Sequence, residues 1–235
     1  MKYQKVIHAT FLSRPNRFIA YVRVNGEIEV AHVKNTGRCR ELLVEGCTVY
    51  RAVSDNPLRK TKYDLIAVEK VRAEKPPLMI NMDSQIANDV AGEWLHACNL
   101  FSPNAVVRRE VTHGASRFDF YIEDGDRRAF LEVKGVTLEH GGVAMFPDAP
   151  TERGVKHVEE LSACVSEGFE AYVLFVVQMK DIRLVRPYDE MHRAFGDALR
   201  AAVRCGVHIL AIDCIVSPEE IFPDLPVAVE LGEKK

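Results

Sequence analysis

The chain has 235 residues, of which 47% are hydrophobic and 28% charged, as in a globular protein that can bury a core. Its longest apolar run, residues 171–177, is far shorter than a membrane span, and its first residues lack the apolar segment of a signal peptide. We therefore expect a cytoplasmic protein with no membrane partner. The six cysteines include no C-x-x-C pair, which argues against a zinc or redox site.

The formal net charge of −3 conceals an uneven distribution. Residues 1–75 contain 15 Lys and Arg against 8 Asp and Glu, whereas residues 76–235 contain 16 against 26. A basic N-terminal third favours a segment that binds a polyanion such as a nucleic acid. Surface charge can also be uneven without such a role.

The first third of the chain contains the pattern of short strands joined by turns. Strands are expected over residues 17–24, 27–33, 47–53 and 62–71. Asn25-Gly26 between the first two is a strong hairpin signal. Several short strands without a long helix predict a small OB-like β-barrel, a fold that commonly binds nucleic acid strands. Pro76-Pro77 predicts a linker, so we place this domain at residues 1–77.

Basic residues gather around a turn in this predicted barrel. The Asn-Thr-Gly sequence at residues 35–37 is flanked by Lys34, Arg38 and Arg40. Exposed backbone amides beside such side chains can seat a phosphate, and the alternative is a plain turn before a short helix at residues 40–44. A second basic stretch around residue 60 could tether a DNA backbone or could be a solvated loop. The barrel residues expected to contact DNA are Arg17, Lys34, Arg38, Arg40 and Lys60.

Beyond residue 77, helices and strands alternate. Helices are expected over residues 84–98, 151–167 and 188–205, and strands over residues 106–111, 116–123, 129–138, 171–179 and 207–216. This order predicts a mixed sheet flanked by helices. The predicted fold is thus an α/β domain at residues 78–235 behind the barrel, in a chain that is α+β overall. The segment from Ser217 is rich in Pro and Glu, and we expect it to pack loosely.

A hairpin in the middle of the chain carries the residues with the clearest chemistry. Alternation along the strands places Phe118 and Phe120 on one face and Asp119 on the other, while Glu132 and Lys134 share a face of the second strand. Two carboxylates can bind Mg²⁺ or Mn²⁺, and a nearby lysine can orient a water or stabilise charge on a phosphate. A Glu-x-Lys pair also occurs by chance on solvated strands, but this strand is mostly apolar.

Flanking residues could complete this site. Glu93 borders the apolar stripe of the first predicted helix and could approach the same metal, or could lie on the surface. Three basic side chains occupy the first turns of the second helix, where positive charge opposes the helix dipole unless phosphate oxygens come to the same place. The residues of this domain expected to hold DNA are Arg117, Arg153, Lys156 and His157.

The order of helix, hairpin with Asp and Glu-x-Lys, helix and strand resembles the PD-(D/E)XK core of restriction-endonuclease-like proteins. The match is to the relaxed form, since no proline precedes the aspartate. A more specific resemblance, spread over most of the chain, is to the sugar fermentation stimulation protein A family. The stretches that carry it are HVKNTGR at 32–38, SRFDF at 116–120, LEVKGVTL at 131–138 and MFPDAPTERG at 145–154.

This resemblance implies an OB-like N-terminal domain and a nuclease-like C-terminal domain with Asp119, Glu132 and Lys134 at its metal and catalytic positions. It also implies DNA binding without strong sequence preference and a link to the regulation of maltose metabolism. Three functions remain open: a metal-dependent nuclease acting on double- or single-stranded DNA, a DNA-binding regulatory factor that keeps the scaffold without turnover, and an enzyme acting on another phosphate ester. The basic N-terminal third favours the two DNA functions, and the chain could form a homodimer.

Overall fold

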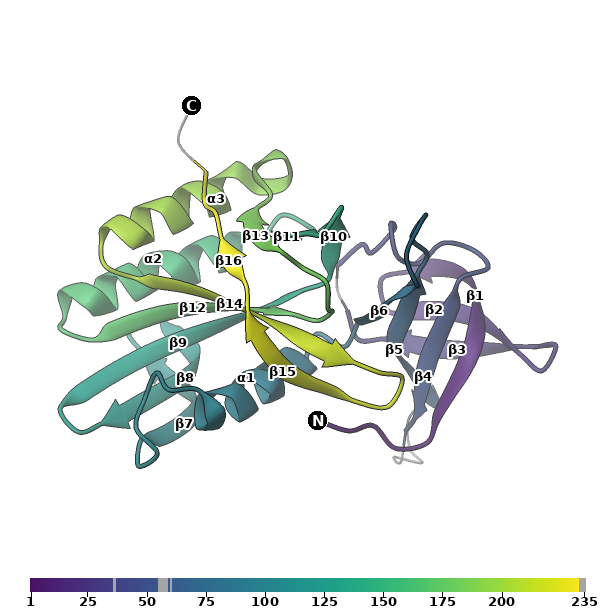
Figure 1. Cartoon of the computed structure of the whole chain (residues 1–235), viewed down its shortest axis with the longest axis horizontal. Helices are drawn as coiled ribbons and strands as arrows, with labels where there is room; N and C mark the ends of the chain where they lie inside the picture. Colours follow the sequence, from purple (N-terminus) through teal and green to yellow (C-terminus); the bar gives the residue numbers. More distant parts are fainter. Residues whose placement is uncertain (36, 55–58, 60, 233–235) are drawn as a thin grey trace.

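The structure, a computed structural model, describes residues 1–35, 37–54, 59 and 61–232. A small β-barrel and a larger α/β unit lie side by side (Figure 1). Both parts of the predicted fold are present. Among the residues described, no helix is both long and apolar enough to cross a membrane.

The barrel is built from five strands that pair in the order β3-β2-β1-β4-β5, and a parallel pairing of β3 with β5 closes it. Asn25 and Gly26 have positive φ angles of 49° and 87°, as a tight hairpin turn requires, and the predicted hairpin is confirmed. The first strand was not predicted; its alternate residues Ala9 and Phe11 enter the core. The strands are β1 (Val6–Asn16), β2 (Ile19–Val24), β3 (Glu27–Val33), β4 (Thr48–Val53) and β5 (Tyr63–Lys70).

The two parts are connected by more than the single predicted linker. The strand after Pro76-Pro77, β6 (Leu78–Asn81), pairs with β5 and so extends the barrel sheet. At the other end of the predicted barrel domain, the backbone N–H of Tyr3 donates to the carbonyl of Glu219, 2.8 Å away, in the α/β unit. The domain boundary at residue 77 stays a prediction. Strand β6, which follows it, pairs with the barrel, and the start of the chain is hydrogen-bonded to the α/β unit.

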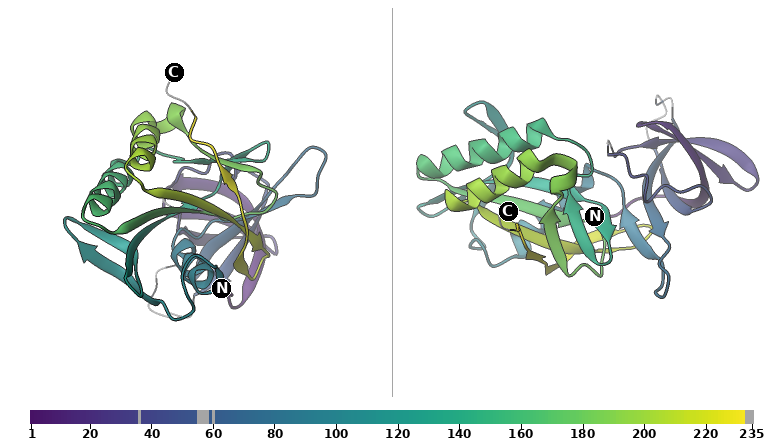
Figure 2. Two further views of the ribbon diagram at one scale, coloured as in Figure 1. Left: turned by 60° about the vertical axis from the view of Figure 1, so that its left-hand side comes forward. Right: turned by 90° about the horizontal axis from the view of Figure 1, so that it is seen from above.

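The α/β unit is organised on a six-stranded mixed sheet of order β15-β14-β12-β9-β8-β7, in which β12 runs parallel to β9 and β14. Helices α2 and α3 cover one face and α1 covers the other (Figures 1 and 2). Its helices are α1 (Ile86–Ala97), α2 (Glu152–Ser166) and α3 (Asp189–Arg204). The sheet strands are β7 (Val106–His113), β8 (Ser116–Asp124), β9 (Arg127–Val136), β12 (Glu170–Val177), β14 (His208–Val216) and β15 (Ile221–Pro226). A second, small sheet contains β10 (Leu138–His140), β11 (Val143–Phe146), β13 (Leu184–Pro187) and β16 (Ala228–Val229).

Local sequence explains these elements well. Strand β12 is apolar on both sides and almost wholly buried, because helices cover both faces of the sheet at its centre. Helix α2 begins after Thr151, whose side-chain oxygen accepts a hydrogen bond from the backbone N–H of Gly154, 3.1 Å away. It ends before Gly168, which has a φ of +90°, as predicted.

Two expectations about packing were wrong. The segment after Ser217 does not pack loosely, because it forms β15 against β14 and β16 against β13, with Ile221 fully buried. Phe118 and Phe120 do not share a face: Phe118 packs in the core under α2 and Phe120 in the core under α1. The ladder between β8 and β9 begins only at Phe120, so the regular alternation is interrupted beside Asp119.

Candidate functional site

Glu132 lies in the middle of β9 and its side chain is buried. Its Oε1 atom accepts two hydrogen bonds, one from the Lys134 ammonium at 2.6 Å and one from Nδ1 of His157. Its Oε2 atom is also buried but has no hydrogen-bond partner in the part of the chain described. Burial alone would raise the pKa of Glu132, yet His157 and Lys134 outweigh it, so the pKa lies below its usual value and the group is ionised at neutral pH.

Asp119 on the neighbouring strand β8 meets this group. Its two oxygens accept hydrogen bonds from the backbone N–H of Val133, at 2.8 Å, and from the side-chain amide of Asn88 on α1, at 2.7 Å. Burial, and then the charge of Glu132, raise the pKa of Asp119. The structure thus brings Asp119, Glu132 and Lys134 together, and their catalytic roles stay a prediction.

The chemistry of this cluster fits a hard divalent cation with few protein ligands. No group of three or more His, Cys, Asp or Glu side chains able to hold a metal occurs among the described residues. Mg²⁺, however, is commonly held by one or two carboxylates together with water and substrate phosphates. The unpartnered Oε2 of Glu132 fits such an ion, since a buried carboxylate oxygen without any partner is costly.

Helix α1 contributes a different residue from the one expected. Glu93 was expected to approach the metal, but the N-terminal ammonium of Met1 lies 3.0 and 3.2 Å from its two oxygens. Asn88, on the same helix, is the residue that reaches Asp119. A search for acidic side chains passes over Asn88, and no feature of the helical pattern singles it out.

Lys134 also lines a cleft of about 410 Å³ between the barrel and the α/β unit. Parts of the cleft wall come from the turn after β3 and from residues 145–151. The cleft shares the lining residues Arg17, Gly37 and Ala149 with a hollow of about 680 Å³ on the barrel. Three exposed arginines of this hollow were expected to bind DNA: Arg17, Arg38 and Arg40.

Arg14, which the sequence analysis did not single out, shapes the rim of this hollow. Its guanidinium donates hydrogen bonds of 2.7–2.9 Å to four backbone carbonyls, those of Arg17, Asn35, Gly37 and Arg38. The turn is also packed tightly against Asp148, because a Cβ atom on Gly37 would lie 1.7 Å from a carboxylate oxygen of Asp148. Any larger residue at this position would have to displace the Asp148 carboxylate.

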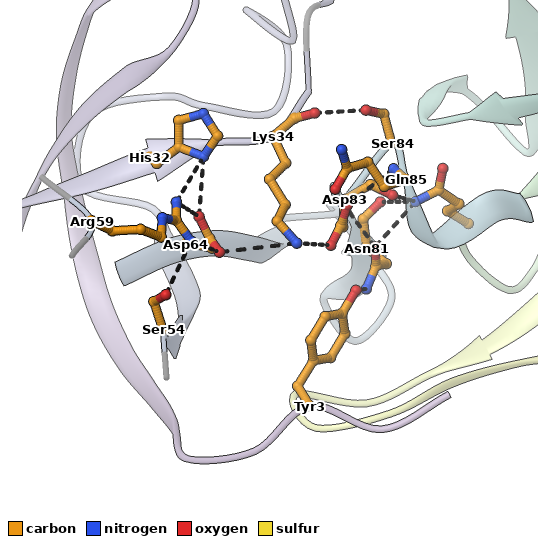
Figure 3. Close-up of polar contacts among 11 residues, drawn as sticks. Tyr3, His32, Lys34, Ser54, Arg59, Asp64, Asn81, Asp83, Ser84 and Gln85 are labelled. Atoms are coloured by element: carbon orange, nitrogen blue, oxygen red, sulfur yellow. Dashed lines mark hydrogen bonds and ion pairs between the residues drawn. The ribbon is translucent and has the colours of Figure 1, made fainter. Parts of the chain in front are cut away.

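Lys34 was also expected to contact DNA, but it is not among the lining residues of the hollow. Its ammonium lies 2.9 Å from the carboxylate of Asp83 and 3.9 Å from that of Asp64 (Figure 3). Asp64 is also bound by Arg59, at 2.6 and 2.7 Å, and by His32, at 3.0 Å. Lys34 therefore links the barrel to the segment before α1, and its positive charge is paired with carboxylates of the protein itself.

The other basic residues of the α/β unit are dispersed. His157 is buried with both ring nitrogens engaged, by Glu132 and by Arg153, so the expectation that it contacts DNA was wrong. Arg153 is exposed beside it. Lys156 donates to the carbonyl of Ala115, and Arg117 lies 3.5 Å from Glu110; neither is among the lining residues of the cleft or the hollow. Lys60 lies outside the described residues.

Known proteins resemble this chain over nearly its whole length. A family model described as the sugar fermentation stimulation protein RE domain matches residues 85–220, and one described as the SfsA N-terminal OB domain matches residues 12–74. Sugar fermentation stimulation protein homologs from Desulfitobacterium hafniense strain Y51 and Clostridium beijerinckii are 54% and 51% identical, over 99% and 94% of this chain and 100% and 96% of their own length. A solved structure of Pyrococcus furiosus SfsA in complex with Ca²⁺ is 28% identical, covers 98% of both chains and has a TM-score of 0.83.

Proposed function

Because the chain belongs to the sugar fermentation stimulation protein family, we propose that it binds DNA in the cytoplasm and cleaves a phosphodiester bond with the help of a divalent cation. One observation carries this proposal. Asp119 and Glu132 lie beside Lys134, which lines a cleft between the two parts of the molecule, and the Oε2 atom of Glu132 has no partner within the described chain.

A divalent cation beside Asp119 would give the unpartnered Oε2 atom of Glu132 a partner. The Pyrococcus furiosus relative is described as a complex with Ca²⁺, which shares the preference of Mg²⁺ and Mn²⁺ for carboxylate oxygens. In this chain Asp119 and Glu132 would hold Mg²⁺ or Mn²⁺. The bound ion would polarise a phosphate and lower the pKa of a coordinated water.

The protein's own groups would do the remaining work. Asn88 and the backbone N–H of Val133 orient Asp119, and His157 orients Glu132. Lys134 lines the cleft and can turn its ammonium from Glu132 to a phosphate oxygen or to the attacking water. There it would stabilise the negative charge that develops in the transition state.

The basic rim of the barrel supports DNA as the substrate. Arg17, Arg38 and Arg40 are exposed around a hollow that shares lining residues with the cleft at Lys134. Arginines placed in this way would contact phosphates, which are common to all sequences, so binding would be weakly sequence-dependent and would weaken steeply as salt rises.

A cleavage assay tests the proposal. We expect purified protein to cut linear, circular or single-stranded DNA with Mg²⁺ or Mn²⁺ and not with EDTA. Parallel binding titrations at several salt concentrations would measure the electrostatic contribution. DNA that is bound but remains intact with both ions would instead support a binding-only regulator. The ion pair that holds Lys134 on Glu132 is the observation that favours this alternative.

A further inference from the structure

We infer that His157 is a positioning residue, which keeps Glu132 in its metal-binding orientation while Lys134 is free to leave Glu132 and act in the cleft. The inference rests on the proposed function, since it assigns a role to His157 within the same site. His157 was expected from its sequence position to contact DNA, but as a buried residue it acts within the site.

The hydrogen bonds around His157 fix its tautomer. Its side chain is 8% exposed, and Arg153 Nε lies 3.3 Å from its Nε2 atom. A guanidinium nitrogen can only donate, so Nε2 accepts and the ring hydrogen is on Nδ1. Nδ1 therefore donates to Oε1 of Glu132. The arginine thus orients the histidine, and the histidine orients the glutamate.

Both donors to Glu132 reach the same oxygen. Lys134 and His157 bond to Oε1, and Oε2 is left without a partner within the residues described. A carboxylate held through one oxygen presents its other oxygen in a fixed direction, which is what a metal ligand requires. One hydrogen bond is enough to orient the carboxylate. If both donors stayed on Oε1 throughout the reaction, one of them would be redundant.

The two donors differ in how easily they can move. Lys134 has a long flexible stem and lines the cleft, whereas His157 is buried, packed against Phe118 with 6.4 Å between ring centroids, and held by Arg153. When the ammonium turns to a phosphate, His157 still satisfies Oε1. Without His157, that movement would leave a buried carboxylate with no hydrogen-bond donor, which is energetically costly.

The experiment compares His157→Asn with His157→Gln by calorimetric titration of the full chain with Mn²⁺ and with Ca²⁺. The amide nitrogen of asparagine lies near the position of Nδ1, and that of glutamine lies near the position of Nε2. We expect His157→Asn to bind the ions within about threefold of the wild type, and His157→Gln and His157→Ala to bind about tenfold or more weakly. His96→Ala, an exposed histidine on α1, is the matched control and should bind as the wild type does.

The outcomes separate this inference from the proposed function. Equal metal affinity for His157→Asn and His157→Gln would overturn the positioning role while leaving the metal site intact. Because both variants carry a polar amide side chain at residue 157, the comparison between them holds even if His157→Ala fails to fold. A wild-type chain that binds neither ion would overturn the proposed function, and this inference with it.

Discussion

Two clusters of this protein place a lysine among buried carboxylates, but they differ in one respect. In the network around Lys34, every carboxylate oxygen of Asp64 and Asp83 has a partner: Lys34, Arg59, His32 or the backbone N–H of Gln85 (Figure 3). In the cluster around Lys134, one oxygen of Glu132 has none among the described residues, although it is buried.

The pKa shifts distinguish the clusters at Asp119, whereas Glu132, like Asp64, has a lowered pKa. Burial opposes ionisation of Asp64, but the hydrogen bonds from Arg59 and His32 outweigh it, so its pKa is lowered. Asp119 has its pKa raised, by burial and then by the charge of Glu132. A buried charge network in which every polar atom has a hydrogen-bond partner can serve the structure alone. A network that leaves a carboxylate oxygen without a partner can accept a ligand there. Lys34 is thus a structural strut and Lys134 a candidate catalytic group.

The largest effect that separates the two lysines is expected on cleavage. Replacing Lys134 by Ala removes the ammonium that would stabilise transition-state charge, so the cleavage rate should fall by about 10³-fold. Metal and DNA binding should change little, because His157 still holds Glu132. Single-turnover cleavage with Mg²⁺, beside calorimetric metal titration, measures both. A Lys134→Ala protein that cuts DNA at the wild-type rate would remove Lys134 from the mechanism.

Replacing Lys34 by Met should instead affect folding. It would leave the nearly buried Asp83 without its ion-pair partner, and removing one partner of a buried pair costs about 3 kcal/mol. Equilibrium unfolding in urea measures the change. Lys2→Met is the control: Lys2 is also ion-paired, to Glu220, but its side chain is 75% exposed, so its loss should cost well under about 1 kcal/mol. Equal losses from the two variants would mean that the Lys34 network is not a strut.

The contrast between the clusters shows how far sequence reasoning could reach. The hairpin, and the shared face of Glu132 and Lys134, follow from strand alternation and a turn signal within some twenty residues. The partners of Lys34 and Glu93 depend on contacts 49 and 92 residues away in sequence. No local pattern encodes such distances, so a basic residue beside a turn was expected to meet DNA and instead meets Asp83. Asn88 escaped for a related reason, because its role depends on the position of Asp119 across the fold.

A smaller effect is expected from Asp119→Asn without added metal. In the wild-type protein Asp119 is partly buried beside the charge of Glu132. A neutral side chain removes both the cost of burying a charge and the repulsion, while Val133 and Asn88 can still be paired. We expect the variant to be more stable than the wild type by roughly 1 kcal/mol at neutral pH. Thermal unfolding measures this difference, and Asp126→Asn, in the exposed turn of the same hairpin, serves as the control. With Ca²⁺ present, the order should reverse, since only the wild type gains stability from the ion.

The smallest effect is the pH dependence of that difference. A carboxyl group whose pKa is raised on folding binds its proton more tightly in the folded state, so its penalty appears as pH rises from the ordinary aspartate range through the raised value. The stability gain of Asp119→Asn should therefore shrink as pH falls and vanish once Asp119 is protonated in the wild type.

Asp64 acts in the opposite sense: its lowered pKa contributes stability above the ordinary range, which both proteins lose equally on acidification. Urea unfolding of the metal-free proteins between about pH 3.5 and 7.5 isolates the Asp119 contribution, because subtracting the two curves removes the shared loss. A difference that grew on acidification would contradict the assigned burial penalty of Asp119 and its repulsion by Glu132, and with them the contrast between the two clusters.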